Sequence, residues 1–263
     1  MSGYAPGQPY WMQIGDEVLR RYDPAKSRVN WELLVGTTPM HFVYNAIPCD
    51  RFEEDFHGVA DFCSNAVLNI LTGEQTWRAT TPSGAGTFDM LDIIGGGVRI
   101  TSGATALNNN MLENGDDGAA RNPWHVDYDP YVHFRFRLPL AADLASLLMY
   151  IGMFYDANNY VTVRAATAVD ANYHLVVNRA GVQTVNVTLE ALDNEWHGFY
   201  AFLDEAAGYY VWDGGAQTLF GGLLPETQLR AYMMIQTLED VAKHLDVSKW
   251  LILQDEFTAA VTS

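Results

Sequence analysis

The second half of the chain is a succession of short apolar or alternating segments separated by turn-forming residues. Between Tyr131 and Gln254 such segments recur about every ten residues, with Gly, Asn, Asp and Pro between them. Alternation with a period of two sends side chains to opposite faces of a strand, whereas a continuous apolar run is typical of a strand buried on both faces. Segments at this spacing predict an all-β fold, a two-sheet sandwich or a barrel.

Individual segments differ in character. Residues 131–138 alternate between apolar and polar side chains, and residues 147–155 are almost entirely apolar, which predicts a central strand. The glycines at 95–97 predict a tight turn between two strands. Short helices are expected at residues 15–22 and 237–245. Further strands are expected at residues 29–35, 66–71, 76–80, 88–94, 98–101, 160–166, 173–177, 182–189, 195–204, 209–212, 229–236 and 247–254.

Residues 1–50 differ from the rest of the chain and hold half of its ten prolines. Proline fixes φ and removes a hydrogen-bond donor, so this spacing predicts an extended, irregular arm ahead of a sandwich at residues 51–263. Its aromatic residues argue against a disordered tail, and four cations beside three acids make its first 28 residues locally basic. Such an arm needs a surface to lie on, either its own sandwich or a neighbouring subunit. The residues expected to carry that contact are Tyr10, Trp11, Arg20, Arg21, Tyr22 and Trp31.

Residues 103–127 are polar and rich in Asn, Asp and Gly, which predicts a long surface loop. Asn114, Asp116 and Asp117 in this loop carry oxygen atoms of the kind that Ca²⁺ prefers. The spacing and terminal Glu of an EF-hand are missing, so a solvated loop is the preferred interpretation, and neither a metal nor a cofactor is expected.

An aromatic cluster follows the loop. Trp124, His125, Tyr128 and Tyr131 lie close together in the sequence and are the best candidates for a glycan-binding platform. Packing against the sandwich or against a neighbouring subunit explains the same residues equally well.

Composition restricts the partners. The chain has 263 residues, 49% of them hydrophobic, and a net charge of −17, so it would repel the phosphate backbone of a nucleic acid. It has no signal-peptide pattern and no apolar run near the ~20 residues of a membrane span. Two cysteines, Cys49 and Cys63, form no disulfide framework, and their spacing does not decide whether they pair.

No catalytic pattern stands out. Glycosidases of sandwich folds need two carboxylates facing one cleft, but Asp89 and Asp92 differ by an odd number and would face opposite sides of a strand. Asp127 and Asp129 share a face only if the loop-like segment before Pro130 is extended. There is no Gly-x-Ser-x-Gly nucleophile elbow, and the seven histidines lack metal-binding spacing. We therefore expect a protein that is not an enzyme.

Several segments carry a family resemblance. They are the alternating 130–138 segment, the apolar Ile151–Tyr155 segment with the turn after it, Glu195–Phe199, the Tyr210–Gly215 hairpin and Thr237–Val247. Over about residues 51–257 the chain resembles the concanavalin A-like (laminin-G-like) jelly-roll domain of tailed-phage virion structural proteins. The resemblance implies a two-sheet antiparallel jelly-roll sandwich, and its motifs reflect sandwich geometry more than one activity.

The resemblance also implies a function. It suggests a non-enzymatic bacteriophage virion protein, either a capsid decoration (cement) protein attached through the arm or a tail or fibre component. Its partners would be copies of itself, for which a trimer would suit a capsid, and capsid or tail proteins. It would be made in the host cytoplasm and reside in the virion. The alternatives are a carbohydrate-binding module that recognises a host-surface glycan and a glycosidase or lyase of the same fold.

Overall fold

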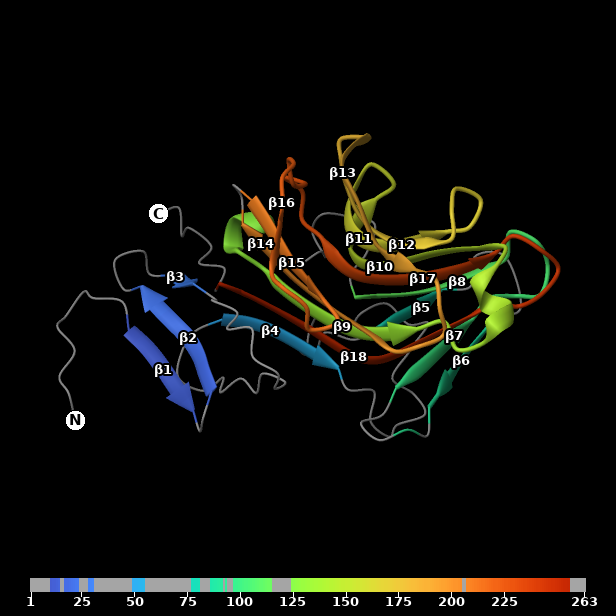
Figure 1. Ribbon diagram of the computed structural model, residues 1–263, viewed down its shortest axis with the longest axis horizontal. Coiled ribbons are helices and arrows are strands. Elements are labelled where there is room, and N and C mark those ends of the chain that lie inside the picture. Colours follow the sequence, from blue (N-terminus) through green and yellow to red (C-terminus); the bar gives the residue numbers. More distant parts are fainter. Residues whose placement is uncertain are drawn as a thin grey trace.

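Two antiparallel β-sheets packed face to face form the body of the described part of the chain (Figure 1). The computed structural model describes residues 10–14, 17–23, 28–30, 49–54, 77–80, 86–91, 93, 97–114, 124–204 and 207–255. The all-β sandwich expected from the sequence is confirmed, and no described helix is long and apolar enough to cross a membrane.

The first sheet, called the front sheet here, has seven strands in the order β13-β12-β11-β10-β17-β8-β5. β10 lies at its centre, as its apolar sequence predicts. The bounds are β5 Arg78–Thr80, β8 Asn109–Asn114, β10 Leu147–Asp156, β11 Asn159–Ala166, β12 Asn172–Arg179, β13 Val182–Ala191 and β17 Arg230–Thr237.

The second sheet, called the back sheet here, runs β16-β15-β14-β9-β18-β7-β6, and β4 pairs with the end of β18. Its strands are β4 Cys49–Glu54, β6 Thr87–Met90, β7 Val98–Thr101, β9 Tyr131–Arg137, β14 His197–Asp204, β15 Ala207–Trp212, β16 Thr218–Phe220 and β18 His244–Asp255. Two 3-10 turns, η3 Val126–Tyr128 and η4 Ala141–Leu144, flank β9.

Three further strands, β1 Tyr10–Ile14, β2 Glu17–Asp23 and β3 Arg28–Asn30, form an antiparallel sheet of their own. In Figure 1 this sheet lies beyond β4, to the left of the sandwich. The helix expected at residues 15–22 is therefore wrong, because residues 17–22 of this segment lie in β2. β1 and β2 pair along their backbones, and this pairing outweighs a weak local preference for helix.

The core lies between the two sheets and follows the alternation seen in the sequence. On β9, Val132, Phe134 and Phe136 point inward and are at most 2% exposed. The Phe134 ring stacks on Phe199 of β14 at 5.1 Å and on Trp250 of β18 at 5.0 Å, so three neighbouring strands of the back sheet are joined by aromatic contacts.

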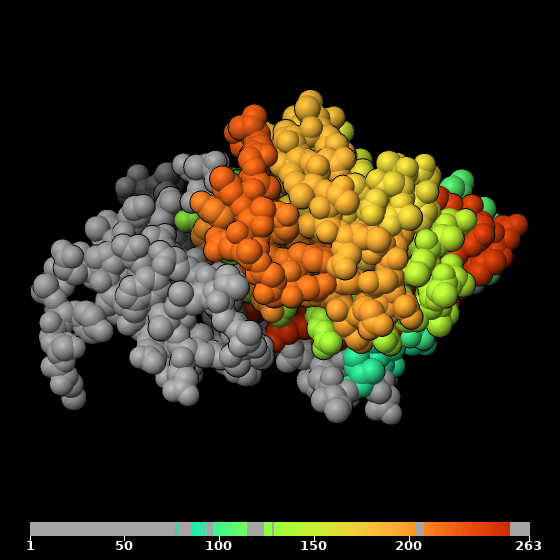
Figure 2. All heavy atoms as spheres, in the orientation of Figure 1, coloured from blue at the N-terminus to red at the C-terminus, as the bar shows by residue number. Residues whose placement is uncertain are grey.

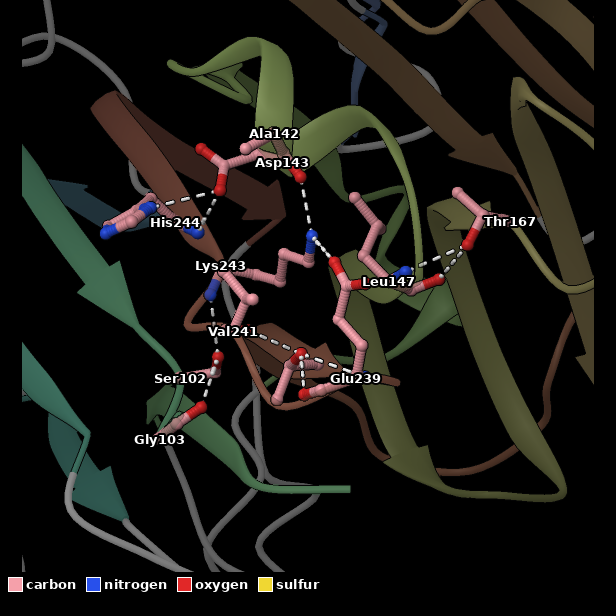
Figure 3. A network of polar contacts seen from close by, with 11 residues as sticks. Ser102, Gly103, Ala142, Asp143, Leu147, Thr167, Glu239, Val241, Lys243 and His244 are labelled. Atoms are coloured by element: carbon pink, nitrogen blue, oxygen red, sulfur yellow. Dashed lines mark hydrogen bonds and ion pairs between the residues drawn. The ribbon is translucent and has the colours of Figure 1, made fainter. Parts of the chain in front are cut away.

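The helix expected at residues 237–245 is also wrong. After β17 the chain forms a series of bends, and β18 begins at His244. Lys243 organises this segment: its side chain is fully buried, and Nζ donates to the carbonyl of Ala142 and to the carboxylate of Glu239, both at 2.5 Å (Figure 3). The buried carboxylate of Asp143 accepts from the backbone N–H of His244. These tertiary contacts give the backbone partners that a helix would otherwise supply.

The surface loop expected at residues 103–127 is wrong in part, because β8 occupies its centre. Leu112 of β8 is fully buried, and so is Asn110, whose side-chain amide donates to the carbonyl of Thr101 at 2.6 Å. An asparagine whose side chain is hydrogen-bonded can be buried, even where an Asn-rich composition predicts a surface loop. Residues 66–71, another expected strand, lie outside the described residues.

Candidate functional site

A band of aromatic side chains crosses the outer face of the front sheet, the face turned away from the core. Alternation sends Tyr150 and Phe154 of β10 to this face. The Phe154 ring stacks on Tyr232 of β17 at 4.3 Å and on Tyr160 of β11 at 5.6 Å, and Tyr160 meets Tyr150 edge-on at 5.7 Å. These four rings, called the aromatic band below, span the three central strands.

Gly152 lies in the middle of the band and contributes no side chain. Its φ of +152° and its neighbours explain why: a Cβ there would lie 2.3 Å from the carbonyl oxygen of Val161 and 2.7 Å from Cα of Thr162. The close approach of β10 to β11 therefore requires glycine, and the sheet carries no side chain at this point of the band.

An ion pair between Arg230 and Glu113 borders the band on the β17–β8 side. Arg230 Nε lies 2.8 Å from Glu113 Oε2, and the side chains are 3% and 1% exposed. The guanidinium also lies over the rings of Phe154 and Tyr232 and donates to the carbonyl of Tyr155 at 2.9 Å. Glu113 is thus held by a cation and is not positioned as a free general acid or base.

Polar side chains of β11 and β12 border the band on the other side. Arg164 and His174 are direct neighbours across the two strands. His174 Nε2 lies 2.9 Å from both carboxylate oxygens of Asp170, and this contact lowers the pKa of Asp170. Thr162 and Asn178 lie on the same face, 1% and 9% exposed. Guanidinium, imidazole, hydroxyl and amide groups thus adjoin the ring faces, a combination typical of polar ligand sites.

A second cluster joins the front sheet to the back sheet around His197. Its Nδ1 lies 2.7 Å from Asp213 and its Nε2 lies 2.9 Å from Asp193. Burial lowers the pKa of His197, but the hydrogen bonds and charges of Asp213 and Asp193 together outweigh it, so the pKa is raised. Two carboxylates can both accept only from a doubly protonated ring, so His197 is an imidazolium that ties these loops together.

Aromatic rings enclose the imidazolium. Trp212 stacks on His197 at 4.7 Å and donates to the carboxylate of Glu190 at 2.8 Å, and Tyr173 meets the imidazole edge-on at 5.0 Å. Figure 2 shows β13 beside β14–β16 on one side of the molecule, the region that these contacts join. Side-chain ligand atoms of Glu190, His197 and Asp213 lie within 4.8 Å of one another, but a metal would require Nδ1 of His197 to give up its proton. We assign the cluster a structural role.

The outer face of the back sheet is basic, in contrast to the chain as a whole. Arg99 and Arg137 both bind the buried carboxylate of Asp246, at 2.6 and 3.0 Å. The guanidinium groups of Arg135 and Arg137 lie over the ring of Trp196, at 5.0 and 4.7 Å from its centroid. Arg99, Arg135 and Arg137 are thus engaged by one carboxylate and one aromatic ring.

The aromatic cluster expected to form a glycan platform does not form an exposed one. Trp124 is fully buried and Tyr131 is 3% exposed, because the first bridges to Leu229 and the second begins β9 under neighbouring strands. His125 contacts the carbonyl of Glu226 at 3.0 Å. The side chain of Tyr128 lies outside the described part of the chain. Trp124 and Tyr131 are therefore packed within the sandwich, one of the alternatives left open by the sequence.

The other expected residues fall in different places. Asn114, the first of the three calcium candidates, is 1% exposed in β8, and Asp116 and Asp117 lie outside the described residues. Cys49 begins β4, and Cys63 also lies outside the described residues.

Five of the six arm residues fall on one hairpin. The register of β1 and β2 sets Tyr10 opposite Tyr22, Trp11 opposite Arg21 and Met12 opposite Arg20. Trp31 lies beyond the end of β3, outside the described residues.

Sequence reasoning missed the aromatic band entirely. The available signal was the alternation within β10 and β17. Tyr150 and Phe154 are separated by an even number of residues on β10, so they share a face, and Tyr232 occupies the same outward face of β17. A central strand buried on both faces has no polar side to reveal which of its faces carries function.

Comparison with known proteins identifies the fold and no family. No protein-family model and no curated protein sequence matches the chain. Among solved structures, it resembles an endo-acting O-glycanase of the human gut microbiota (TM-score 0.56, 10% identity, 78% of this chain and 99% of that one). It also resembles a protein of unknown function from Shewanella oneidensis MR-1 (0.54, 12%, 83% and 96%) and the Bacillus licheniformis β-glucanase (0.52, 9%, 78% and 98%). At these identities the similarity shows the fold alone, a concanavalin A-like jelly-roll sandwich.

Proposed function

We propose that this chain is a non-enzymatic structural protein of a bacteriophage virion. It would be a capsid decoration protein attached through its N-terminal segment, or else a tail or fibre component. The observation that carries the proposal is the separate sheet β1–β3, because among the described strands it pairs with none of the sandwich. A sheet that extends the chain beyond its own core is a means of contacting a neighbouring subunit.

The bonds made by three described carboxylates support the non-enzymatic part of the proposal. Glu113 is neutralised by Arg230, and Asp193 and Asp213 hold the imidazolium of His197. Hydrolysis of a glycoside needs one carboxyl group free to give a proton and a second free to act as base or nucleophile. Groups engaged in structural bonds are poorly suited to either role.

Mass spectrometry of gradient-purified phage particles tests the proposal. Peptides of this chain should rise and fall with those of the major capsid or tail proteins across the gradient, at a fixed ratio. A chain found only in the soluble fractions of the lysate would contradict it, and turnover of any member of a polysaccharide panel would contradict its non-enzymatic part.

Carbohydrate binding is the second candidate, and the aromatic band favours it. Sugar rings stack on aromatic faces while neighbouring polar groups bond their hydroxyls, and the front sheet offers both in Phe154, Tyr160 and the polar groups of β11 and β12. A glycan array tests this candidate: binding that Phe154→Ala abolishes without unfolding the protein would support it, and no binding to any glycan would contradict it.

A further inference from the structure

Four polar atoms on the outer face of β11 and β12 are buried and unmatched. They are Arg164 Nε, Thr162 Oγ1, His174 Nδ1 and Asn178 Oδ1, and none has a hydrogen-bond partner among the residues that the structure describes. The residues Thr162, His174 and Asn178 are 1%, 6% and 9% exposed. Buried polar groups of native proteins are almost always bonded, so four such atoms on two adjacent strands indicate a partner from outside the chain.

The charge of this group distinguishes it from an ordinary hydrated surface. Arg164 forms no ion pair with a described residue, whereas Arg99, Arg137, Arg179 and Arg230 each bind a carboxylate. Arg135 also lacks a described acidic partner, but its guanidinium lies over the ring of Trp196, whereas no such contact with a described ring is seen for Arg164. A guanidinium on a partly enclosed face is suited to bind an anion, above all a carboxylate, which it can hold through two parallel hydrogen bonds.

The neighbours of Arg164 suit a saccharide. Tyr150 lies directly across from it on β10, and Tyr160 lies four residues before it on the same face of β11. Burial, followed by the proximity of Tyr150, raises the pKa of Tyr160, which keeps its hydroxyl neutral as a donor and acceptor. Ring faces and neutral hydrogen-bonding groups around a single cation match the alternating apolar faces and hydroxyls of a sugar chain.

We propose that the outer face of β10–β12 binds a saccharide that carries carboxylate groups, with Arg164 as the residue that recognises the acid. Thr162, His174 and Asn178 bond its hydroxyls, and the aromatic band receives the sugar ring. The inference rests on the carbohydrate-binding candidate and names the class of sugar. An acidic peptide offers the same carboxylate, but it does not use the ring faces and the neutral polar groups together.

The test is an array of uronic-acid and sialic-acid oligosaccharides, each printed beside the same oligosaccharide with its carboxyl groups reduced to alcohols. Poly-glutamate serves as the peptide control. The full chain is compared with Arg164→Gln and with Arg179→Gln, which removes an equal charge from the end of β12. Circular dichroism and thermal unfolding establish that both variants are folded.

We expect binding to at least one acidic oligosaccharide, a loss of about tenfold or more on reduction of its carboxyl groups, and a similar loss in Arg164→Gln but not in Arg179→Gln. Equal binding of the reduced form would overturn the inference and leave the carbohydrate-binding candidate standing. Equal binding of poly-glutamate, or unchanged binding by Arg164→Gln, would also overturn the inference. No binding to any glycan would contradict both.

Discussion

Arg230 and Glu113 form an ion pair on the outer face of the front sheet with almost no access to solvent, 3% and 1% of each side chain. Two charges taken out of water depend strongly on each other, so removal of one leaves the other uncompensated. We expect Glu113→Ala to lower the free energy of unfolding by about 3–5 kcal/mol. The double variant Glu113→Leu/Arg230→Met should be less destabilised than Glu113→Ala, as measured by urea denaturation. A double variant at least as unstable would contradict the interpretation.

The imidazolium of His197 makes stability depend on pH. Its pKa is raised in the folded protein, so its contribution is complete below the unfolded value of about 6.5 and is lost as pH rises through the folded pKa. The destabilisation caused by His197→Gln should therefore be larger at pH 6 than at pH 9. Urea denaturation of both proteins across this range measures the difference. A constant difference would mean that folding does not shift the pKa of His197, and a smaller effect at pH 6 than at pH 9 would mean that the folded protein holds the ring neutral.

The same cluster should need no metal. Since both ring nitrogens of His197 bond carboxylates, the cluster is complete without an ion. We expect an excess of EDTA to leave the melting temperature of the purified protein unchanged, and subsequent Zn²⁺ or Ca²⁺ at a small excess to have no stabilising effect. A fall with EDTA that the ion restores would instead identify Glu190, His197 and Asp213 as metal ligands.

The close approach of β10 to β11 depends on Gly152. A methyl group there would meet the backbone of Val161 and Thr162, neither of which can move without opening the sheet. We expect Gly152→Ala to lower the free energy of unfolding by about 2–5 kcal/mol. Gly221→Ala is the matched control, because nothing lies within 4 Å of its added Cβ, and its effect should stay within about 0.5 kcal/mol. Equal effects of the two changes would contradict this account.

We expect buried Lys243 to stabilise the conformation of the segment between β17 and β18. Lys243→Ala removes the bonds to Ala142 and Glu239 and leaves a cavity, which we expect to cost about 2–4 kcal/mol. Val241→Ala changes a side chain that is 49% exposed in the same segment and should have little effect. Hydrogen exchange of the backbone amides between β17 and β18 measures the loss of local stability. If these amides are as well protected in Lys243→Ala as in the native protein, other contacts order the segment.

The sequence predicted the sandwich because the alternation of β9 and the apolar run of β10 are local patterns that match the period of a strand. It did not predict β8, where a buried Asn110 is acceptable only because Thr101, on a strand of the other sheet, supplies an acceptor. The helix expected at 237–245 failed for a similar reason, since the partners of Lys243 lie far away in the sequence. Contacts between distant segments decide such positions, and local periodicity does not contain them.

The candidate site was less predictable than the fold. Trp124 and Tyr131 looked accessible because they adjoin a polar segment, yet both are buried. Arg164 and His174 stood out in no motif, and they become a pair only through the register of β11 and β12. A site assembled across strands is visible only after the strands have been paired.

Sedimentation of the full chain beside a version that lacks residues 1–48 tests the central claim most directly. The deletion stops before Cys49, where β4 begins, so that no strand of the sandwich is removed. If the N-terminal segment is an assembly device, the full chain should self-associate as concentration rises, while the shortened chain remains a folded monomer. Two identical monomers would show that residues 1–48 do not drive self-association, and this would contradict the proposal that the chain assembles through them.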